Sequence, residues 1–425
     1  MKRHVAASTA FIGAALAAVL GGLASNRTEA AQNQKSVAVP IFEVDYKFPT
    51  MPGKMLLGGV GGATADSHGN VWVFHRPHTL EEGNATENGW GPAPPVVEFS
   101  PDGKYLQGWG GPSKTGEYQW FNRGGLYSAH VECQSCSKER RTNGDGRPGS
   151  GEHGIFIDAN DSVWLTGNGD GDGHILKFTK DGKFLLQIGK GGVSADSNDT
   201  THLSRPASLA VFRNEVFVAD GYGNRRIVVF DANTGAYKRH WGAYGKKPDD
   251  SYFTNAGETL PGPFSGRVQN ENRPSQYDPN GPPPPQFRIV HAVRISRDGF
   301  VYVCDRTNDR LQVFRKDGTF VQEAFIAKET FGSGSVWDVG FSIGPEQTFL
   351  IVIDGTNQQV YVLRRKSLEI VNTFGGAGHW AGQFYGAHNL AVDSHGNLFI
   401  TETYEGKRVQ KFLFKGLSAP AGGRQ

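Results

Sequence analysis

The chain has few cysteines and almost no excess of charge of either sign. Three Cys in 425 residues exclude a disulfide-rich scaffold. The 44 Lys and Arg residues nearly balance the 42 Asp and Glu residues, which argues against the basic surface of a nucleic-acid binder. The 58 glycines follow no Gly-X-Y period, so collagen is excluded as well. Because 37% of the residues are hydrophobic and glycine is abundant, the composition favours a globular all-β protein with many tight turns.

The beginning of the chain holds the only apolar run that approaches the length of a membrane span. Lys2 and Arg3 precede small and apolar residues 6–23, and further small residues up to Ala30 offer a cleavage site. We therefore predict a secretory signal peptide over residues 1–30, with no membrane span after its removal. An uncleaved N-terminal membrane anchor is the alternative. The mature protein is expected to be secreted or periplasmic.

A pattern of about 40 residues recurs six times. Residues 382–416 are its clearest copy. This copy consists of an apolar strand, an Asp-Ser-His-Gly-Asn turn and two further strands. Four short strands in a unit of this length are typical of a propeller blade, so we predict an all-β fold, a six-bladed propeller of NHL-type repeats over residues 55–416. Residues 31–54 would supply a ring-closing strand, and residues 417–425 a C-terminal tail. The other five copies lie at residues 59–110, 152–190, 205–242, 286–326 and 334–376.

Two stretches, at about 112–151 and 246–285, are too polar to be blades. We predict long loops over one face of the disc, with disordered insertions as the alternative. Cys133 and Cys136 form a CxxC pair in the first stretch, and the residue that follows is not the His of a haem attachment site. A local disulfide or a thiol pair is favoured over a second metal site. Cys304 ends an apolar run and is predicted to be a small buried residue.

Histidine occupies one position of the repeat in every second blade. The position two residues before Ala63 and its five equivalents reads, in the six copies, Gly61, His153, Ala207, His291, Trp337 and His388. Innermost strands line the axis of a propeller, and alternate blades of six lie about 120° apart. His153, His291 and His388 are therefore expected to converge on the axis. Three neutral imidazoles with an open fourth position are the ligand set of a catalytic zinc. The alternative is three unrelated polar or core histidines.

These sequences resemble the peptidyl-α-hydroxyglycine α-amidating lyase family. The residues around His153, His291 and His388 are similar to the family's inner-strand motifs His-Gly-Leu, Pro-His-Ser-Leu and His-Asp-Ile. The family's Asp-Gly-Tyr, Phe-His-Arg and Ala-Asp-Arg motifs are similar to segments that end at Tyr222, Arg76 and Arg306. The resemblance spans all six blades. It implies a six-bladed propeller with an axial zinc ion on the three histidines and a structural calcium ion.

The resemblance also implies roles for individual residues. Tyr222 would be the catalytic base, and Arg76 and Arg306 would favour its phenolate or hold a substrate carboxylate.

The backbone carbonyl groups of Ala63 and Ile155 would bind the calcium ion. The third calcium ligand of the family is an Asp, and this chain has Asn389 in its place, a neutral oxygen donor that weakens the site.

The activity that the resemblance implies is that of a carbon–nitrogen lyase. It would cleave the N–Cα bond of an α-hydroxyglycine, a hemiaminal, to give a primary amide and glyoxylate. The expected substrate is a peptide or small molecule with a C-terminal α-hydroxyglycine, and the expected protein is a monomer. Two other functions stay open: a non-enzymatic NHL propeller that binds a peptide, glycan or protein, and a metal-dependent propeller hydrolase or lactonase. The axial imidazoles favour zinc over the calcium of the latter class.

Overall fold

The structure is a computed structural model. It describes residues 38–80, 89–121, 142–143, 147–148, 151–169, 171–193, 196–254 and 278–418. The signal peptide predicted over residues 1–30 and the pair Cys133 and Cys136 lie outside the described residues. Contacts within the chain define two units, a larger one at Phe42–Lys415 and a smaller one made of the two chain ends.

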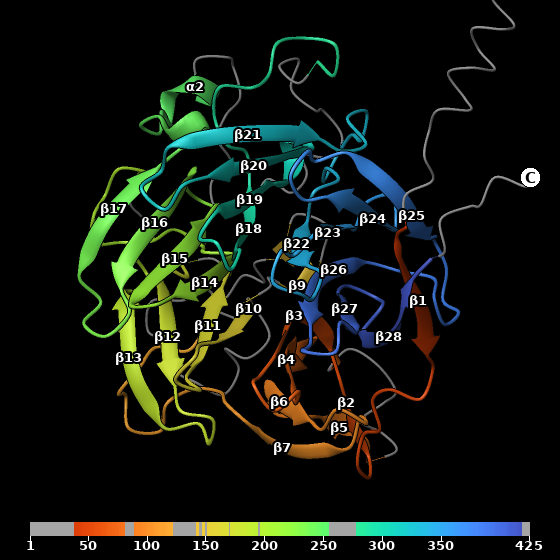
Figure 1. Cartoon of the computed structure of the whole chain (residues 1–425). Helices are drawn as coiled ribbons and strands as arrows, with labels where there is room; N and C mark the ends of the chain where they lie inside the picture. Colours follow the sequence, from red (N-terminus) through yellow and green to blue (C-terminus); the bar gives the residue numbers. More distant parts are fainter. Residues whose placement is uncertain are drawn as a thin grey trace, which may run out of the picture. The chain divides into compact units, whose positions relative to one another are not determined.

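Six four-stranded sheets form the larger unit, which confirms the predicted six-bladed propeller (Figure 1). From the innermost strand outward, the first three blades are β3 (Gly59–Ala65), β4 (Val71–Arg76), β6 (Val96–Phe99), β7 (Tyr105–Trp109); β10 (Glu152–Ile157), β11 (Val163–Gly167), β12 (His174–Phe178), β13 (Phe184–Gly189); and β14 (Ser208–Phe212), β15 (Glu215–Asp220), β16 (Arg226–Asp231), β17 (Tyr237–Trp241). The last three are β18 (Val290–Ile295), β19 (Val301–Asp305), β20 (Arg310–Phe314), β21 (Phe320–Phe325); β22 (Asp338–Phe341), β23 (Phe349–Asp354), β24 (Gln359–Arg364), β25 (Ile370–Gly375); and β26 (Ala387–Val392), β27 (Leu398–Glu402), β28 (Arg408–Leu417), β1 (Pro40–Asp45).

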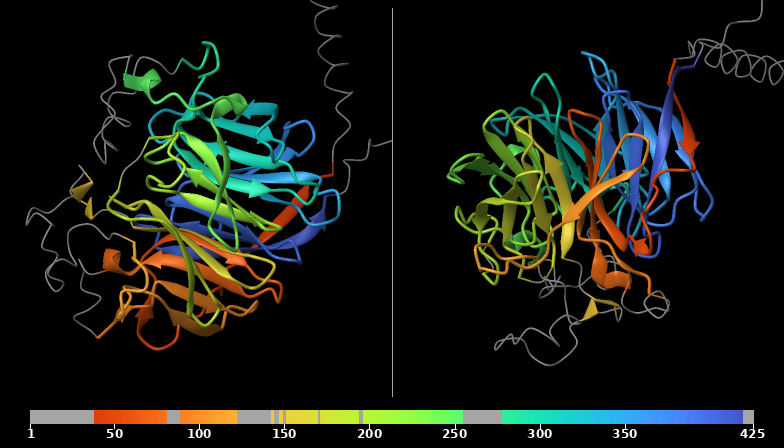
Figure 2. Two further views of the ribbon diagram at one scale, coloured as in Figure 1. Left: turned by 90° about the vertical axis from the view of Figure 1, so that its left-hand side faces the viewer. Right: turned by 90° about the horizontal axis from the view of Figure 1, so that it is seen from below.

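The first strand of each blade contacts the first strand of the next. The contacts run from β3 to β10, β14, β18, β22 and β26, and β26 contacts β3 again. The ring is therefore closed, and these six strands surround its centre (Figure 1). Figure 2 shows the same sheets from two other sides.

The sixth blade combines strands from both ends of the described chain. β1 pairs with β28 as the outermost strand of this blade. Phe42 of β1 packs with its ring centroid 5.5 Å from that of Phe374 and 5.9 Å from that of Phe414. In the smaller unit, the amide of Val39 donates to the hydroxyl of Ser418 at 3.0 Å.

The hydrophobic core lies between neighbouring blades rather than inside each one. Successive side chains of a strand point to opposite faces of its sheet, and both faces of a middle blade are covered. In β15, Val216 and Val218 pack toward Trp164 of the second blade, whereas Phe217 and Ala219 pack toward the fourth. The middle strands are therefore continuous hydrophobic runs, which explains why they contain so many Val, Ile and Phe residues.

Aspartates at the ends of the first strands organise the turns. One carboxylate oxygen of Asp66 accepts from the amides of His68 and Asn70 at 2.9 Å, and the other accepts from the indole of Trp72 at 3.2 Å. Asp158 makes the same contacts in the second blade. These aspartates are therefore turn residues, as their position in the repeat predicts.

The first predicted loop differs from a purely polar loop. Its residues 112–121 insert aromatic side chains into the cluster between the first and second blades. Phe121 is buried and stacks on His174 with 5.1 Å between ring centroids. Most residues of this stretch are polar, but it contains the short run Tyr-Gln-Trp-Phe. The aromatic side chains of this run supply enough apolar surface to pack against the blades.

Few other elements are present in the described chain. No helix there has the length and apolar character needed to cross a membrane.

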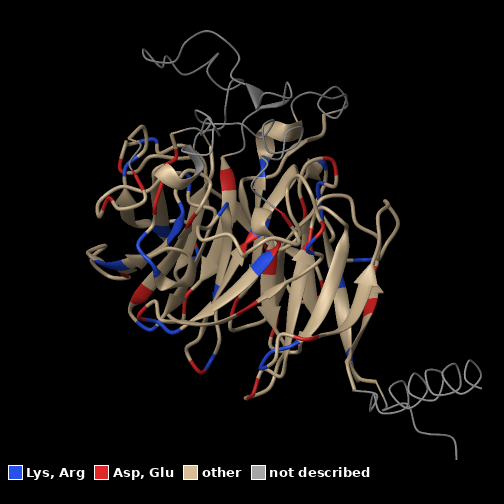
Figure 3. Cartoon of the chain, turned by 90° about the horizontal axis from the view of Figure 1, so that it is seen from above, with Lys and Arg blue, Asp and Glu red and all other residues tan. Residues whose placement is uncertain are grey.

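Lys and Arg residues are interspersed with Asp and Glu residues in the view of Figure 3. The remaining elements are β2 (Met55–Leu56), β5 (Gly91–Pro92), β8 (Thr142–Asn143), β9 (Arg147–Pro148), η1 (Pro77–Leu80), η3 (Ala243–Gly245), η4 (Arg306–Asn308) and α2 (Ser251–Thr254).

Candidate metal centre

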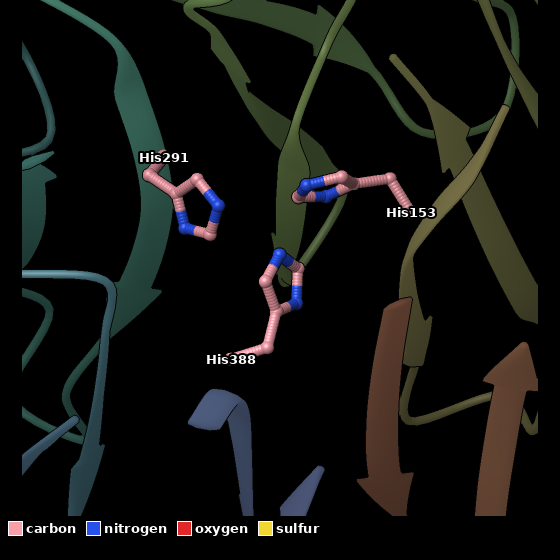
Figure 4. A group of neighbouring side chains, drawn as sticks. All are labelled: His153, His291 and His388. Carbon is pink, nitrogen blue, oxygen red and sulfur yellow. The ribbon is translucent and has the colours of Figure 1, made fainter. Parts of the chain in front are cut away.

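Three histidines from alternate blades meet at the centre of the ring. His153, His291 and His388 are each the second residue of an innermost strand, β10, β18 and β26. Their ring centroids form a nearly equilateral triangle with sides of 5.0, 4.7 and 4.9 Å. One nitrogen from each ring lies within 4.8 Å of the other two, and the rings point toward one another (Figure 4). This is the convergence that the repeat position predicts.

Irregular strand pairing accompanies each histidine. The register between the first and second strands slips by one residue at Glu152/Ile155, at Val290/Ala292 and at Ala387/Leu390. The same slip occurs at Val60/Gly62 in the first blade, which lacks the histidine, whereas the pairing is regular in the third and fifth blades. An extra residue in one strand re-aims the neighbouring side chain. A bulge therefore lies beside each imidazole, although it is not restricted to the blades that carry a histidine.

The next blade along the ring orients each imidazole. The Nδ1 atoms of His153, His291 and His388 lie 2.7, 2.6 and 2.7 Å from backbone carbonyl oxygens. Because a carbonyl only accepts, each Nδ1 carries the hydrogen and each Nε2 keeps its lone pair. The acceptors occupy the aligned repeat position in the odd blades and are Ala207, Trp337 and Gly61.

The imidazoles are held in the neutral form that metal binding requires. Burial is the main cause that lowers the pKa of His153, His291 and His388 well below the usual value for histidine. The positive charge of Arg306 lowers the pKa of His291 further, and that of Arg76 lowers the pKa of His388. The Nε2 atom of His291 is buried and has no hydrogen-bond partner among the described residues. The donor set and its tautomers therefore fit a divalent metal ion.

Close backbone packing beside His153 requires glycine. A side chain at Gly154 would place its Cβ 2.6 Å from the Thr166 hydroxyl and 2.7 Å from the carbonyl oxygen of Ala207. That carbonyl accepts both from Nδ1 of His153 and from Thr166. Gly154 therefore lets the second and third blades approach closely enough to orient the imidazole.

Tyr222 lies at the edge of the histidine triangle. Its hydroxyl is 3.1 Å from Nε2 of His153 and 3.1 Å from Nη1 of Arg306. Since Nε2 is the unprotonated nitrogen, the phenol donates to His153 and accepts from Arg306. The structure thus brings together the tyrosine, one arginine and one histidine that the sequence predicts for the site.

Arg76 reaches the same centre from the first blade. Its Nε donates to the carbonyl oxygen of Glu152 at 2.8 Å, and its Nη1 donates to the hydroxyl of Thr403 at 2.6 Å. Arg76 and Arg306 are 5% and 4% exposed, and no carboxylate of the described chain is within ion-pair distance of either guanidinium. Two buried positive charges beside neutral imidazoles make the centre attractive to an anion.

Sequence reasoning missed three residues that contact this group. Trp337 stacks on the guanidinium of Arg306, and the Cζ atom of Arg306 lies 4.4 Å from the centroid of the Trp337 ring. Arg205 lies over the ring of Tyr222 at 5.7 Å and adopts a φ of 58°. Thr403 binds Arg76. Trp337 could have been found, because it occupies the aligned repeat position between the second and third histidines.

The side chain of Asn389, one of the residues predicted for calcium, is held by protein groups. The side-chain oxygen of Asn389 accepts from the amide of Ala63 at 2.8 Å, and its amide nitrogen donates to Asp338 at 2.6 Å. Calcium takes six to eight oxygen ligands and favours carboxylates. Because its side-chain oxygen already accepts from Ala63, Asn389 is a weak candidate for a calcium ligand in this chain.

Comparisons with known proteins point to the amidating lyases. No family profile matches the chain. Peptidyl-α-hydroxyglycine α-amidating lyase 1 of Drosophila melanogaster is 25% identical over 390 residues, which cover 86% of this chain and 58% of that protein. Lyase 2 of the same organism is 28% identical over 284 residues, which cover 61% of this chain and 55% of that protein. The chain thus spans less than two thirds of the length of these relatives.

Among solved structures, a streptogramin B lyase superposes with a TM-score of 0.48 at 11% identity, over 90% of this chain and 100% of that one. The sequence relatives confirm the resemblance to the amidating lyase family that the motifs indicate.

Proposed function

We propose that the chain is an exported, zinc-dependent carbon–nitrogen lyase that cleaves the N–Cα bond of an α-hydroxyglycine. The products are a primary amide and glyoxylate. One observation carries the proposal: three buried, neutral imidazoles converge beside Tyr222 and two buried arginines without a carboxylate partner in the described chain. The names of the sequence relatives support the reaction class.

The three Nε2 atoms of His153, His291 and His388 would hold the zinc ion. When bound, zinc supplies Lewis acidity toward a hydroxyl oxygen at its open position. The chain keeps the ligands ready, because the carbonyl groups behind each Nδ1 fix both the tautomer and the ring orientation.

The arginines would bind the carboxylate of the α-hydroxyglycine. The Nε atom of Arg306 is buried and has no hydrogen-bond partner among the described residues, while Nη1 holds Tyr222. A guanidinium presents several donors in one plane and suits a carboxylate. Arg76 adds a second positive charge, although two of its nitrogens already donate to the backbone carbonyl of Glu152 and to the hydroxyl of Thr403.

Tyr222 would move the proton. As the N–Cα bond breaks, the hydroxyl oxygen of the substrate becomes the aldehyde oxygen of glyoxylate and loses its proton to the phenolate of Tyr222. Tyr222 then passes the same proton to the departing amide nitrogen, so the atoms balance without an external oxidant or reductant. Nη1 of Arg306 donates to the Tyr222 hydroxyl oxygen at 3.1 Å and would hold this group in position.

The substrate is proposed to be a peptide or small molecule that ends in α-hydroxyglycine. The protein would act outside the cytoplasm as a monomer, after removal of the signal peptide over residues 1–30. Neutral imidazole ligands distinguish this proposal from calcium-dependent propeller hydrolases, which need oxygen ligands at the axis.

The experiment is a paired measurement on the purified chain. Zinc content is determined first, and glyoxylate release from N-benzoyl-α-hydroxyglycine is then followed, with Tyr222→Phe as the matched variant. The proposal requires glyoxylate from the wild type and zinc in both proteins. Zinc without glyoxylate release would overturn the lyase assignment and leave the metal centre intact.

A further inference from the structure

A second layer of polar side chains joins neighbouring inner strands close in sequence to the aligned histidine position. Ser208, Asp338 and Asn389 each follow the aligned repeat position in the third, fifth and sixth blades. Arg294 of β18 reaches into this layer from the fourth blade. These four residues form a continuous hydrogen-bonded chain that also includes the backbone of Ala63.

The contacts link five of the six blades. Arg294 donates through Nη1 to the hydroxyl of Ser208 at 3.0 Å and through Nη2 to Asp338 at 2.7 Å. Asn389 donates to the same Asp338 oxygen at 2.6 Å and accepts from the amide of Ala63 at 2.8 Å. The third, fourth, fifth, sixth and first blades are thereby joined around the axis.

The carboxylate at the middle of this chain is buried and fully engaged. The side chain of Asp338 is 1% exposed and that of Arg294 is 13% exposed. One oxygen of Asp338 accepts from Arg294, from Asn389 and from the amide of Leu390; the other accepts from the amide of Val339. Arg294 is the cation within 4.0 Å of this carboxylate in the described chain.

The structure assigns the cation of this layer to Arg294. The resemblance implies a calcium ion near Asn389, but the chain meets the negative charge of Asp338 with its own guanidinium. A buried carboxylate requires a positive partner, and an arginine provides one together with directed hydrogen bonds. In the described chain, these inner strands are therefore joined at this layer without a calcium ion. This inference depends on the contacts of the layer and not on the reaction.

The test measures thermal unfolding of the full chain and its calcium content. The melting temperature of the wild type is expected to be the same in millimolar calcium and in millimolar EGTA, and the purified protein is expected to retain no stoichiometric calcium. One bound calcium per chain, or a melting temperature that rises with calcium, would overturn the inference.

A double-mutant cycle tests the role of Arg294 itself. Arg294→Gln leaves Asp338 unpaired and is expected to lower the melting temperature by roughly 5 °C or more. Adding Asp338→Asn removes the buried charge and is expected to restore part of the loss, or to restore folding if the single variant does not fold. Arg364→Gln, which removes an exposed ion pair with Glu369, is the control and should shift the melting temperature by about 1 °C or less. Strictly additive effects of Arg294→Gln and Asp338→Asn would contradict the pairing.

Discussion

The imidazole of His388, in the last blade, donates its Nδ1 hydrogen to the carbonyl oxygen of Gly61 in the first blade, 2.7 Å away. The two residues are 327 positions apart, so this bond exists only when the ring is closed. His153 and His291 make the same bond to the blade that follows each of them. The orientation of every ligand therefore depends on contact between blades, and the centre is assembled by the propeller as a whole.

Gly154→Ala is expected to weaken metal binding. The added methyl group would crowd the Ala207 carbonyl that orients His153, and loss of such a partner lowers metal affinity about 10- to 100-fold. Competition with a chromophoric chelator measures this affinity. Gly91→Ala is the control, because a Cβ at Gly91 meets no atom within 4 Å. Equal affinities in the two variants would argue against orientation by the backbone.

Tyr222→Phe is expected to lower kcat by about 100-fold or more while leaving the metal content unchanged. The substitution removes the group that would exchange the proton and keeps the ring that packs on His153. Steady-state glyoxylate release and metal analysis of the same sample measure the two effects. A variant with near wild-type kcat would show that another group carries the proton.

Arg306→Gln is expected to raise KM about 10-fold or more, since the carboxylate loses its charged partner, and to lower kcat, since Tyr222 loses its hydrogen bond. Arg306→Lys should recover charge but not the planar contact with Trp337. Kinetics with N-benzoyl-α-hydroxyglycine and with its uncharged methyl ester separate the effects. If the substitution raises KM by the same factor for the ester and for the acid, Arg306 does not bind the carboxylate.

Stability is expected to fall as the pH decreases from about 6.5 toward 4. Burial lowers the pKa of His174 to about 4, although its bond to the Gln119 carbonyl opposes the shift. The unfolded chain, with an ordinary histidine pKa of about 6.5, then binds the proton first, and the free energy of unfolding loses up to about 3 kcal/mol over this range.

The variant His174→Gln keeps a donor for Gln119 and removes the titration. Urea unfolding at pH 7 and pH 4.5 should show a smaller loss for the variant than for the wild type. An identical loss in both proteins would exclude His174 as a source of the acid sensitivity.

The repeat made the fold and the histidines predictable. Six copies of one pattern specify six blades, and a shared repeat position predicted which three of the thirteen histidines would meet. Equivalent positions of the blades lie at the same level along the axis of a closed ring. Aligning the six copies therefore predicted which residues meet there, although they are far apart in the sequence.

Other features depend on contacts between residues that are far apart and have no periodic signal. The bulges beside the histidines change strand pairing without changing residue type. The pairing of Arg294 with Asp338 crosses from one blade to the next, and each residue alone looks like an ordinary surface charge in the sequence. The local motif around Asn389 also does not reveal that Asp338 and Arg294 lie beside it.

Metal analysis of the purified wild type beside the triple variant His153→Ala, His291→Ala and His388→Ala tests the central claim most directly. The account predicts about one zinc ion per wild-type chain and none in the triple variant, with the β-sheet circular dichroism of both proteins alike. Equal metal content in the two proteins, or a metal-free wild type after reconstitution with zinc, would contradict it.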